Sequence, residues 1–466
     1  MLMSKFRVVC AIAFLLLLNA CAFSAPTRTA TPPFSTSTNE IIPTTTEGSL
    51  TIEGPWLIII DDNQTYVANR DGTCLTPLLS GVSAWQVAIS PTSNMVAVAT
   101  YKQRRLNELT LFLFNLPDKN IKREISLLSF FTKQPKSFDN DESTGPWYGI
   151  NDNIQWSPDG RYLAFMGAIE SPSSSLYVYD SHKDVIKRLS QNTYQAANPT
   201  CSPNGQWIIF EGVSNFQGPV TEGIWAATPD GTQLKLLYKP IDYAQQEILD
   251  WVGNDNFVVV DKSYAIVQGN IRIVNLETGN VVMLYAGSYL NVSLDTKHAA
   301  VAFSPWSGAP GAGLNLEGGI YLVSPEITKP KLISLADGGP WATWDSETEL
   351  FISSIECKNI SGSVIAFNSS GDTSCVPKPE PKLDMSPDGQ WYIVESDGLN
   401  VYRADGEILG TISEITNGST NWRPDSQGFF VETKETLFYV SLPDLIVHIV
   451  YQTKNEFFYT TWVGVH

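Results

Sequence analysis

Histidine is sparse in this 466-residue sequence, with four copies, and the residue types that carry out catalysis are not spaced for it. An α/β-type serine hydrolase would contain a Gly-x-Ser-x-Gly elbow, and none is present. A zinc site is not supported, because no histidine occurs in His-Glu-x-x-His or His-x-His spacing: His182, His298, His448 and His466. The glycine-rich run 308–313 lacks the lysine of a phosphate-binding loop, so we interpret it as a hairpin loop. We therefore predict no catalytic residues.

One acidic and aromatic segment is the best candidate for a binding site. Asp139, Asp141 and Glu142 alternate with short polar residues and could offer oxygen ligands to Ca²⁺. The glycine and the final glutamate of an EF-hand loop are missing, so a solvated acidic loop is the alternative. Trp147 and Tyr148 follow, either as a stacking platform for a sugar or peptide or as residues that pack the segment onto the fold. No other cofactor is indicated.

The cysteines predict one disulfide. Cys357 and Cys375 flank two predicted strands of one hairpin and are candidates for a bridge outside the cytoplasm. Cys201 takes the place of a repeated tryptophan and is predicted to lie in the core. Cys74 is not assigned a role.

A repeated turn and strand must position all of these residues. Ser157-Pro158-Asp159-Gly160 has the residues of a type I turn, and the apolar run 162–165 behind it predicts a buried strand. Close copies of the turn begin at Ser202 and Ser386, and a second apolar run such as 175–180 follows each turn. Self-similarity at roughly 40–50 residues with four short strands in each unit is typical of a β-propeller.

The stretch from Trp156 to Phe165, followed by an aromatic strand that ends at Asp180, resembles the WD-like repeat of TolB-type proteins. The same repeat forms the propeller of dipeptidyl-peptidase IV-like enzymes. The resemblance covers about residues 50–466 and implies an all-β propeller that contacts other proteins in the cell envelope. Those peptidases carry catalysis in a separate α/β-hydrolase domain, and TolB has a separate N-terminal domain; we recognise a counterpart of neither.

The second-position strands are nine in number, whereas eight-bladed propellers are commoner. We predict a single propeller of about eight four-stranded blades, with nine as the literal number, and seven is not favoured. The strand expected at 56–60 lacks a partner before it in the sequence, and the run 457–464 copies 250–253 but has no strand after it. Pairing these two terminal strands would close the ring and remove the exposed sheet edges.

The N-terminus predicts export and lipid anchoring. Lys5 and Arg7 precede the apolar run 8–18, which is the length of a signal-peptide core and shorter than a membrane span. The sequence Leu18-Asn19-Ala20-Cys21 resembles the bacterial lipobox, whose cysteine becomes lipid-modified after cleavage. An ordinary signal peptide and an uncleaved anchor are the alternatives. We expect a signal peptide at 1–20, a lipidated Cys21 with a flexible Ser/Thr/Pro-rich tether at 21–48, and a propeller at 49–466.

Composition limits the partners. The formal net charge of −18 disfavours nucleic acid and anionic lipid, which both need basic patches. We therefore expect a non-catalytic protein on the extracytoplasmic side of a membrane, held there through its lipid anchor only. Its ligand would be a protein, peptide or polysaccharide of the envelope. The alternative is a glycan-active lyase or hydrolase that uses acidic residues at the propeller channel.

Overall fold

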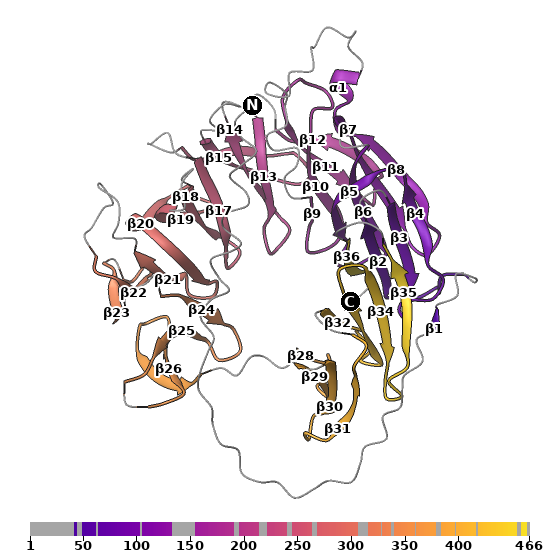
Figure 1. The fold of residues 1–466 in the computed structure, drawn as a ribbon. Coiled ribbons are helices and arrows are strands. Elements are labelled where there is room, and N and C mark those ends of the chain that lie inside the picture. The colour runs from indigo at the N-terminus through magenta and orange to yellow at the C-terminus, as the bar shows by residue number, and fades with distance from the viewer. Residues whose placement is uncertain are drawn as a thin grey trace, which may run out of the picture. The chain divides into compact units, whose positions relative to one another are not determined.

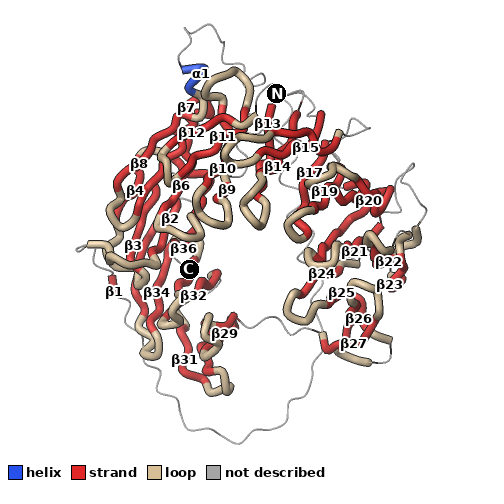
Figure 2. The backbone as a smooth tube through the Cα atoms, turned by 180° about the vertical axis from the view of Figure 1, so that it is seen from behind, coloured by secondary structure: helices blue, strands red, loops and turns tan. Residues whose placement is uncertain are grey.

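The computed structural model describes residues 42–43 and 49–463, with gaps at 62–63, 103–104, 133–153, 191–194, 214–220, 240–244, 263–267, 306–315, 328, 337–339, 359, 379–383, 397, 416–417 and 454–457. The described part from Glu40 onward forms one compact unit. It consists of antiparallel sheets that follow one another along the chain, as expected for a β-propeller (Figure 1). The single described helix, α1 (Ser129–Thr132), has four residues, so no described helix could span a membrane (Figure 2).

The first four sheets come from the N-terminal half and one terminal strand. One sheet combines β36 (Phe458–Val463), β2 (Trp56–Asp61), β3 (Gln64–Asn69) and β4 (Thr76–Ser80). The next contains β5 (Ser83–Ile89), β6 (Met95–Lys102), β7 (Arg105–Asn115) and β8 (Asn120–Ser126). It is followed by β9 (Gln155–Trp156), β10 (Tyr162–Gly167), β11 (Ser175–Asp180) and β12 (Val185–Arg188). The fourth contains β13 (Gln195–Cys201), β14 (Ile208–Val213), β15 (Thr221–Ala227) and β16 (Leu234–Tyr238).

The fifth sheet has seven strands: β17 (Gln245–Val252), β18 (Asn256–Lys262), β19 (Gln268–Asn275), β20 (Val281–Asp295), β21 (Ala300–Pro305), β22 (Gly319–Val323) and β23 (Lys331–Leu335). The sixth contains β24 (Ala342–Asp345), β25 (Leu350–Glu356), β26 (Ser363–Phe367) and β27 (Thr373–Pro377). The seventh contains β28 (Asp384–Met385), β29 (Trp391–Ser396), β30 (Gly398–Arg403) and β31 (Ile408–Ile412). The last contains β32 (Ser419–Trp422), β33 (Gly428–Glu432), β34 (Thr436–Ser441) and β35 (Val447–Gln452), and β1 (Ile42–Pro43) pairs with β35 in parallel.

The number of sheets and the number of repeat units differ because of β20. This strand of 15 residues is the fourth strand of one unit and continues into the first strand of the next. The described residues therefore form eight sheets that contain nine four-stranded units, which agrees with the predicted all-β propeller and with both numbers obtained from the sequence.

The predicted closure of the fold is confirmed. Strand β36, from the C-terminal end, pairs antiparallel with β2 along its whole length, from Trp56 opposite Val463 to Asp61 opposite Phe458. The first sheet thus takes its first strand from the end of the chain, and β2 has no open edge on this side.

The repeated turn has the geometry that its residues predict. The Gly160 amide donates to the Ser157 carbonyl at 2.8 Å, and Gly160 has φ +66°, a conformation that favours glycine. The Ser157 hydroxyl donates to Asp159 at 2.5 Å and accepts the amide of Tyr162 at 2.9 Å. The same hydroxyl bonds recur in the turns that begin at Ser202 and Ser386.

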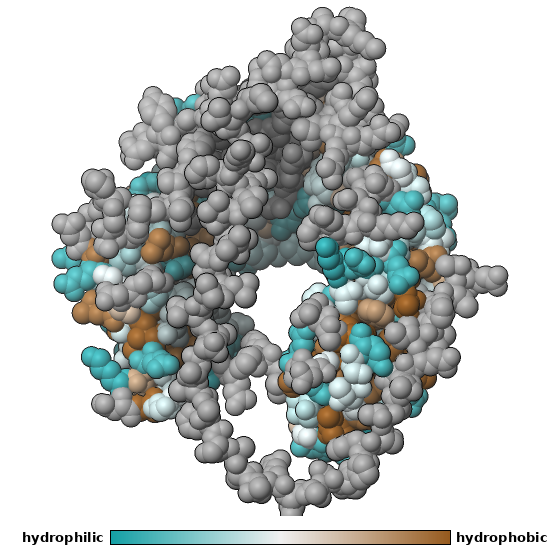
Figure 3. All heavy atoms as spheres, viewed as in Figure 1, coloured by the Kyte–Doolittle hydropathy of each residue, from teal (hydrophilic) through white to brown (hydrophobic). Residues whose placement is uncertain are grey.

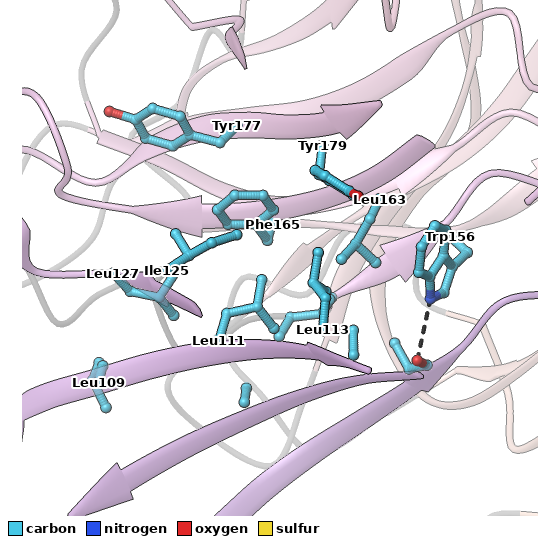
Figure 4. Packing of buried hydrophobic residues seen from close by; sticks show 14 of the residues in the cluster. Leu109, Leu111, Leu113, Ile125, Leu127, Trp156, Leu163, Phe165, Tyr177 and Tyr179 are labelled. Carbon is cyan, nitrogen blue, oxygen red and sulfur yellow. Dashed lines mark hydrogen bonds between the residues drawn. The ribbon is translucent and has the colours of Figure 1, made fainter. Parts of the chain in front are cut away.

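The hydrophobic core lies between neighbouring sheets, because alternate residues of a strand face opposite sides. From β10, Leu163 and Phe165 pack toward the sheet β5–β8, whereas Ala164 and Met166 pack toward β13–β16. Figure 4 shows the first of these clusters, with Trp156 at its edge. The described surface in Figure 3 mixes hydrophilic and hydrophobic residues over the sheets.

The described cysteines fall into two pairs of different kinds. Cys357 follows β25, Cys375 lies in β27, and the two are joined by a disulfide with Cα atoms 6.1 Å apart. Cys74 and Cys201 are buried and do not take part in this disulfide. Burial raises the pKa of Cys201 to about 12, so its thiol is inert at neutral pH.

Candidate functional site

Most of the side chains predicted for binding or modification lie outside the described residues. This holds for Cys21, for Asp139, Asp141 and Glu142, and for Trp147 and Tyr148. These six assignments stay predictions. Among the described residues, no group of three or more His, Cys, Asp or Glu side chains is placed to hold a metal ion.

The structure instead contains a cavity between the first strands of consecutive sheets. It has a volume of about 310 Å³ and is lined by β5, β9, β13 and β17, together with the residue before β9. The lining is mainly polar and includes two amides, a hydroxyl and a carboxylate: Gln86, Ile154, Gln155, Thr200, Ile248, Leu249 and Asp250. Its volume is at the lower end of the range of small-ligand pockets, roughly 300–1,000 Å³.

Three of these lining residues occupy one repeated position. Gln155, Thr200 and Asp250 each stand immediately before the residue at the repeated tryptophan position, and each pairs with the equivalent residue of the second strand of its unit. The corresponding residues of three other units are Ser293, Asp384 and Asn421. We call this set the pre-tryptophan row.

Members of the pre-tryptophan row connect one sheet to the next. Gln155 Oε1 accepts the backbone amide of Cys201 at 2.9 Å, and Ser293 Oγ accepts that of Trp344 at 2.9 Å. Asn421 Oδ1 and Asp384 Oδ1 accept indole N–H groups of the following sheets, both at 2.9 Å. In each case the donor belongs to the tryptophan position of the next unit. We call each of these hydrogen bonds between neighbouring units a latch.

The latch is missing beside the cavity. Thr200 belongs to the row, and the next tryptophan position is Trp251, whose side chain is only 5% exposed. Trp251 Nε1 is buried and has no hydrogen-bond acceptor in the described part of the chain. By contrast, the indole of Trp156 donates to the carbonyl of Ala88 at 3.1 Å (Figure 4). Among the described residues, the junction between β13 and β17 therefore lacks the hydrogen bond that joins neighbouring units at the four latched junctions.

Asp250 is the charged residue of this open junction. It is exposed, and its Oδ1 accepts the backbone amide of the adjacent Trp251 at 2.7 Å. It also lines a second cavity of about 400 Å³, which is bounded by turn residues of three units: Pro203, Trp251, Gly253, Asn254 and Thr296. One carboxylate thus borders both cavities.

This arrangement is suited to binding. Gln86 Oε1 accepts the amide of Ile154 at 3.2 Å, so the amide groups of Gln86 and Gln155 are each oriented by the next sheet. Glycosidases use two carboxyl groups that face each other across the substrate, and the described lining residues of the two cavities supply one. The site offers oriented hydrogen-bonding groups and a single negative charge.

A serine, a histidine and an aspartate also meet elsewhere, between β20 and the turn after β26. His298 Nδ1 lies 2.7 Å from Asp295 Oδ2 and 3.3 Å from Ser369 Oγ, and the Ser369 hydroxyl donates to the same Asp295 oxygen at 2.5 Å. In a catalytic triad the serine and the carboxylate contact opposite nitrogens of the imidazole. Here both lie at Nδ1, so the serine is not activated as a nucleophile.

This contact is structural. Burial alone would raise the pKa of Asp295, but hydrogen bonds from Ser369, His298 and backbone amides outweigh burial and lower the pKa. A buried, ionised and fully hydrogen-bonded aspartate holds the two neighbouring units together.

Sequence reasoning missed the cavity residues, although a signal for some of them exists. Gln155, Asp250 and Asn421 all directly precede a tryptophan in the repeats. A recurrent polar residue at that register predicts a shared structural role, but the sequence does not show which members find a partner in the next sheet.

The chain is similar to several solved structures at low sequence identity. No protein-family model matches the chain. TolB from Acinetobacter baumannii is 15% identical with a TM-score of 0.31, over 59% of this chain and 62% of TolB. Porphyromonas gingivalis dipeptidyl peptidase 4 is 13% identical with a TM-score of 0.42, over 79% of this chain and 59% of the peptidase. A eukaryotic initiation factor is 10% identical with a TM-score of 0.47, over 88% and 98%.

The chain therefore spans less than two thirds of the length of TolB and of the peptidase. At these identities and TM-scores the likeness carries no conclusion about function.

Proposed function

We propose that this protein is a non-catalytic β-propeller that binds a protein, peptide or polysaccharide of the cell envelope. The observation that carries the proposal is the cavity between β5, β9, β13 and β17, because its amide, hydroxyl and carboxylate groups are held on four different strands. Rigid strands that present a few convergent polar groups are typical of ligand sites.

We infer that the protein lies on the extracytoplasmic side of a membrane, and its N-terminal sequence supports this inference. The charged start, the apolar run 8–18 and Cys21 together support cleavage and lipid attachment, with 22–48 as the tether. The disulfide between Cys357 and Cys375 is consistent with an oxidising compartment.

Lipid attachment is tested by labelling the full chain in cells with a palmitate analogue. Cys21→Ser should lose the label and leave the membrane fraction, whereas the matched control Cys10→Ser should keep both properties. Label or membrane retention in the Cys21→Ser protein would contradict anchoring through this cysteine.

Ligand binding is tested by thermal unfolding of the purified full chain in detergent, with panels of envelope peptides and oligosaccharides. A ligand that binds only the folded protein raises the unfolding temperature by mass action. We expect at least one peptide or glycan to do so without being consumed. Release of new reducing ends from a glycan would instead establish the enzymatic alternative. The absence of any shift would leave a protein as the ligand, and a pull-down from envelope extract that retains no protein would then overturn the binding proposal.

The acidic and aromatic segment enters the same screen as a second proposed site. A shift caused by Ca²⁺ that is lost in Asp139→Ala/Asp141→Ala would assign the ion to this segment. A glycan or peptide shift lost in Trp147→Ala would assign that ligand to Trp147 and Tyr148.

A further inference from the structure

Asp250 is the one charged side chain among the described residues that line the two cavities. The other lining residues carry amide, hydroxyl, indole or aliphatic groups or are glycine. Both cavities therefore receive their net charge from Asp250, and that charge is negative.

The carboxylate of Asp250 is not neutralised by the fold. Among the described residues it accepts a hydrogen bond from the neighbouring Trp251 amide, and no lysine or arginine forms an ion pair with it. Asp261, in β18, is a carboxylate that the fold does neutralise. It accepts Arg272 Nη1 at 2.5 Å and also side-chain amides, which together stabilise a buried charge.

The pre-tryptophan row explains why Asp250 remains available. Asp384 is the other aspartate of the row, and its carboxylate accepts Trp422 Nε1 at 2.9 Å as well as the hydroxyl of Thr420. The unit that follows Asp250 begins within β20, the strand that two units share. None of the described residues of that unit donates a hydrogen bond to Asp250. The two carboxylates have the same register and different surroundings.

We propose that the cavity recognises a basic peptide segment, whose lysine ammonium or arginine guanidinium group pairs with Asp250. This inference rests on the proposed binding function and narrows its ligand class. A cation is favoured because it donates a charge-assisted hydrogen bond to the carboxylate and also supplies the counter-charge that Asp250 lacks, which a neutral donor does not. A metal ion is disfavoured, because Ca²⁺ requires six to eight oxygen ligands and one carboxylate does not supply them.

The neutral lining residues favour a peptide over a glycan as the carrier of that cation. Gln86 and Gln155 use their carbonyl oxygens as acceptors of backbone amides, which leaves their NH₂ groups to donate into the cavity. Donors of this kind match the backbone carbonyls that flank a basic side chain. The formal net charge of −18 also increases the rate at which a cationic ligand arrives.

The test uses the purified full chain in detergent and three small probes: N-acetyl-lysine methylamide, N-acetyl-arginine methylamide and the neutral N-acetyl-norleucine methylamide. Binding is measured by calorimetry at low salt. We expect the two cationic probes to bind at least about tenfold more tightly than norleucine, the change that a single charge-assisted hydrogen bond produces. Asp250→Asn should remove this preference while it keeps an oxygen that can accept the Trp251 amide.

Asp405→Asn is the matched control. Asp405 is also an exposed aspartate whose oxygen accepts a nearby backbone amide, from Glu407 at 3.0 Å, and it lines neither cavity. We expect this variant to bind all probes as the wild type does. If Asp250→Asn does not fold, the salt dependence of the wild type decides, because high salt should weaken the cationic probes and leave norleucine unchanged.

Two results would overturn the inference. Equal binding of norleucine and lysine probes would refute cation recognition, and so would an undiminished preference in Asp250→Asn. In either case a ligand found in the wider panel would leave the binding function intact. If the probes, the panel and the pull-down from envelope extract all show no binding, the binding function itself fails.

Discussion

The closure between the first and last sheets depends on a buried carboxylate whose contribution can be measured. Asp61 ends β2 and is only 7% exposed, and it accepts the hydroxyls of Tyr451 at 2.5 Å and Thr453 at 2.9 Å. Both donors belong to β35 or the residue after it, so they join the two sheets that contain the chain's ends. We predict that Tyr451→Phe destabilises the protein through this single hydroxyl.

The magnitude follows from the charge of the acceptor. A hydrogen bond to a charged group contributes about 1.5–3 kcal/mol, against about 0.5–1.5 kcal/mol between neutral groups. Tyr451→Phe keeps the ring, which packs on Tyr66 at 5.0 Å between centroids, so little beyond the hydroxyl is lost. Tyr66→Phe is the matched control, because that hydroxyl donates to the neutral Gln64. We expect the first substitution to cost about 1 kcal/mol more than the second.

The assay is urea unfolding followed by fluorescence and by circular dichroism, whose transitions must coincide before free energies are compared. A double-mutant cycle of Tyr451→Phe with Asp61→Asn should give a coupling energy of about 1 kcal/mol, since the amide still accepts a neutral bond. If Tyr451→Phe costs no more than Tyr66→Phe, or if the coupling is near zero, the carboxylate does not hold the closure.

Two further predictions concern Glu432 and the repeated glycine. Burial raises the pKa of Glu432, although contacts with Thr460 offset part of the rise, so the folded state binds its proton more tightly than the unfolded state. The stabilisation from Glu432 is present below its unfolded pKa and is lost as the pH rises through its folded pKa. Glu432→Gln should therefore flatten the fall in unfolding temperature above about pH 4.5. An unchanged dependence of the unfolding temperature on pH would contradict this. Gly160 and Gly389 have φ of +66° and +68°, but a Cβ would overlap Thr92 at Gly160 and meets nothing within 4 Å at Gly389. Gly389→Ala should cost about 1–2 kcal/mol for its conformation alone and Gly160→Ala distinctly more, which urea unfolding measures; equal costs would refute the steric argument.

Much of the fold could be predicted because its information is local. The turn at 157–160 needs only its own four residues, and the apolar run behind it is buried because both faces of a middle strand contact neighbouring sheets. The terminal pairing was also visible, since 457–464 copies a first strand and 56–60 lacks one. Such signals repeat in each unit and reinforce one another.

The division of the strands into sheets was harder to predict from the sequence. Residues 281–295 continue through a bulged pairing around Gly287 instead of turning, so two units share a sheet where separate blades are the simple expectation. A glycine in an apolar run is compatible with a turn, a bulge or a close approach. The choice between them depends on β19 and β21, which lie on either side in space.

The candidate site could not be predicted from the sequence for a different reason. The hydrogen bond from the Cys201 amide to Gln155 spans 46 residues of sequence, and the absence of one at Trp251 depends on a residue 51 positions before it. The register of the pre-tryptophan row can be read from the sequence, but whether a member forms the hydrogen bond is decided by whether the next sheet places a donor within its reach.

The hydrogen bonds of the pre-tryptophan row connect the stability of the fold to the position of its cavity. A propeller must join many sheets of similar shape, and Gln155, Asn421 and Asp384 do so by reaching the next tryptophan position. Thr200 and Ser293 both carry a hydroxyl on Cβ, but Ser293 Oγ accepts the Trp344 amide at 2.9 Å, whereas the indole of Trp251, at the equivalent position after Thr200, has no acceptor among the described residues. The two junctions differ in how the next sheet is placed, so the unsatisfied indole and the charge of Asp250 beside the cavity depend on the position of β17 and not on the length of one side chain.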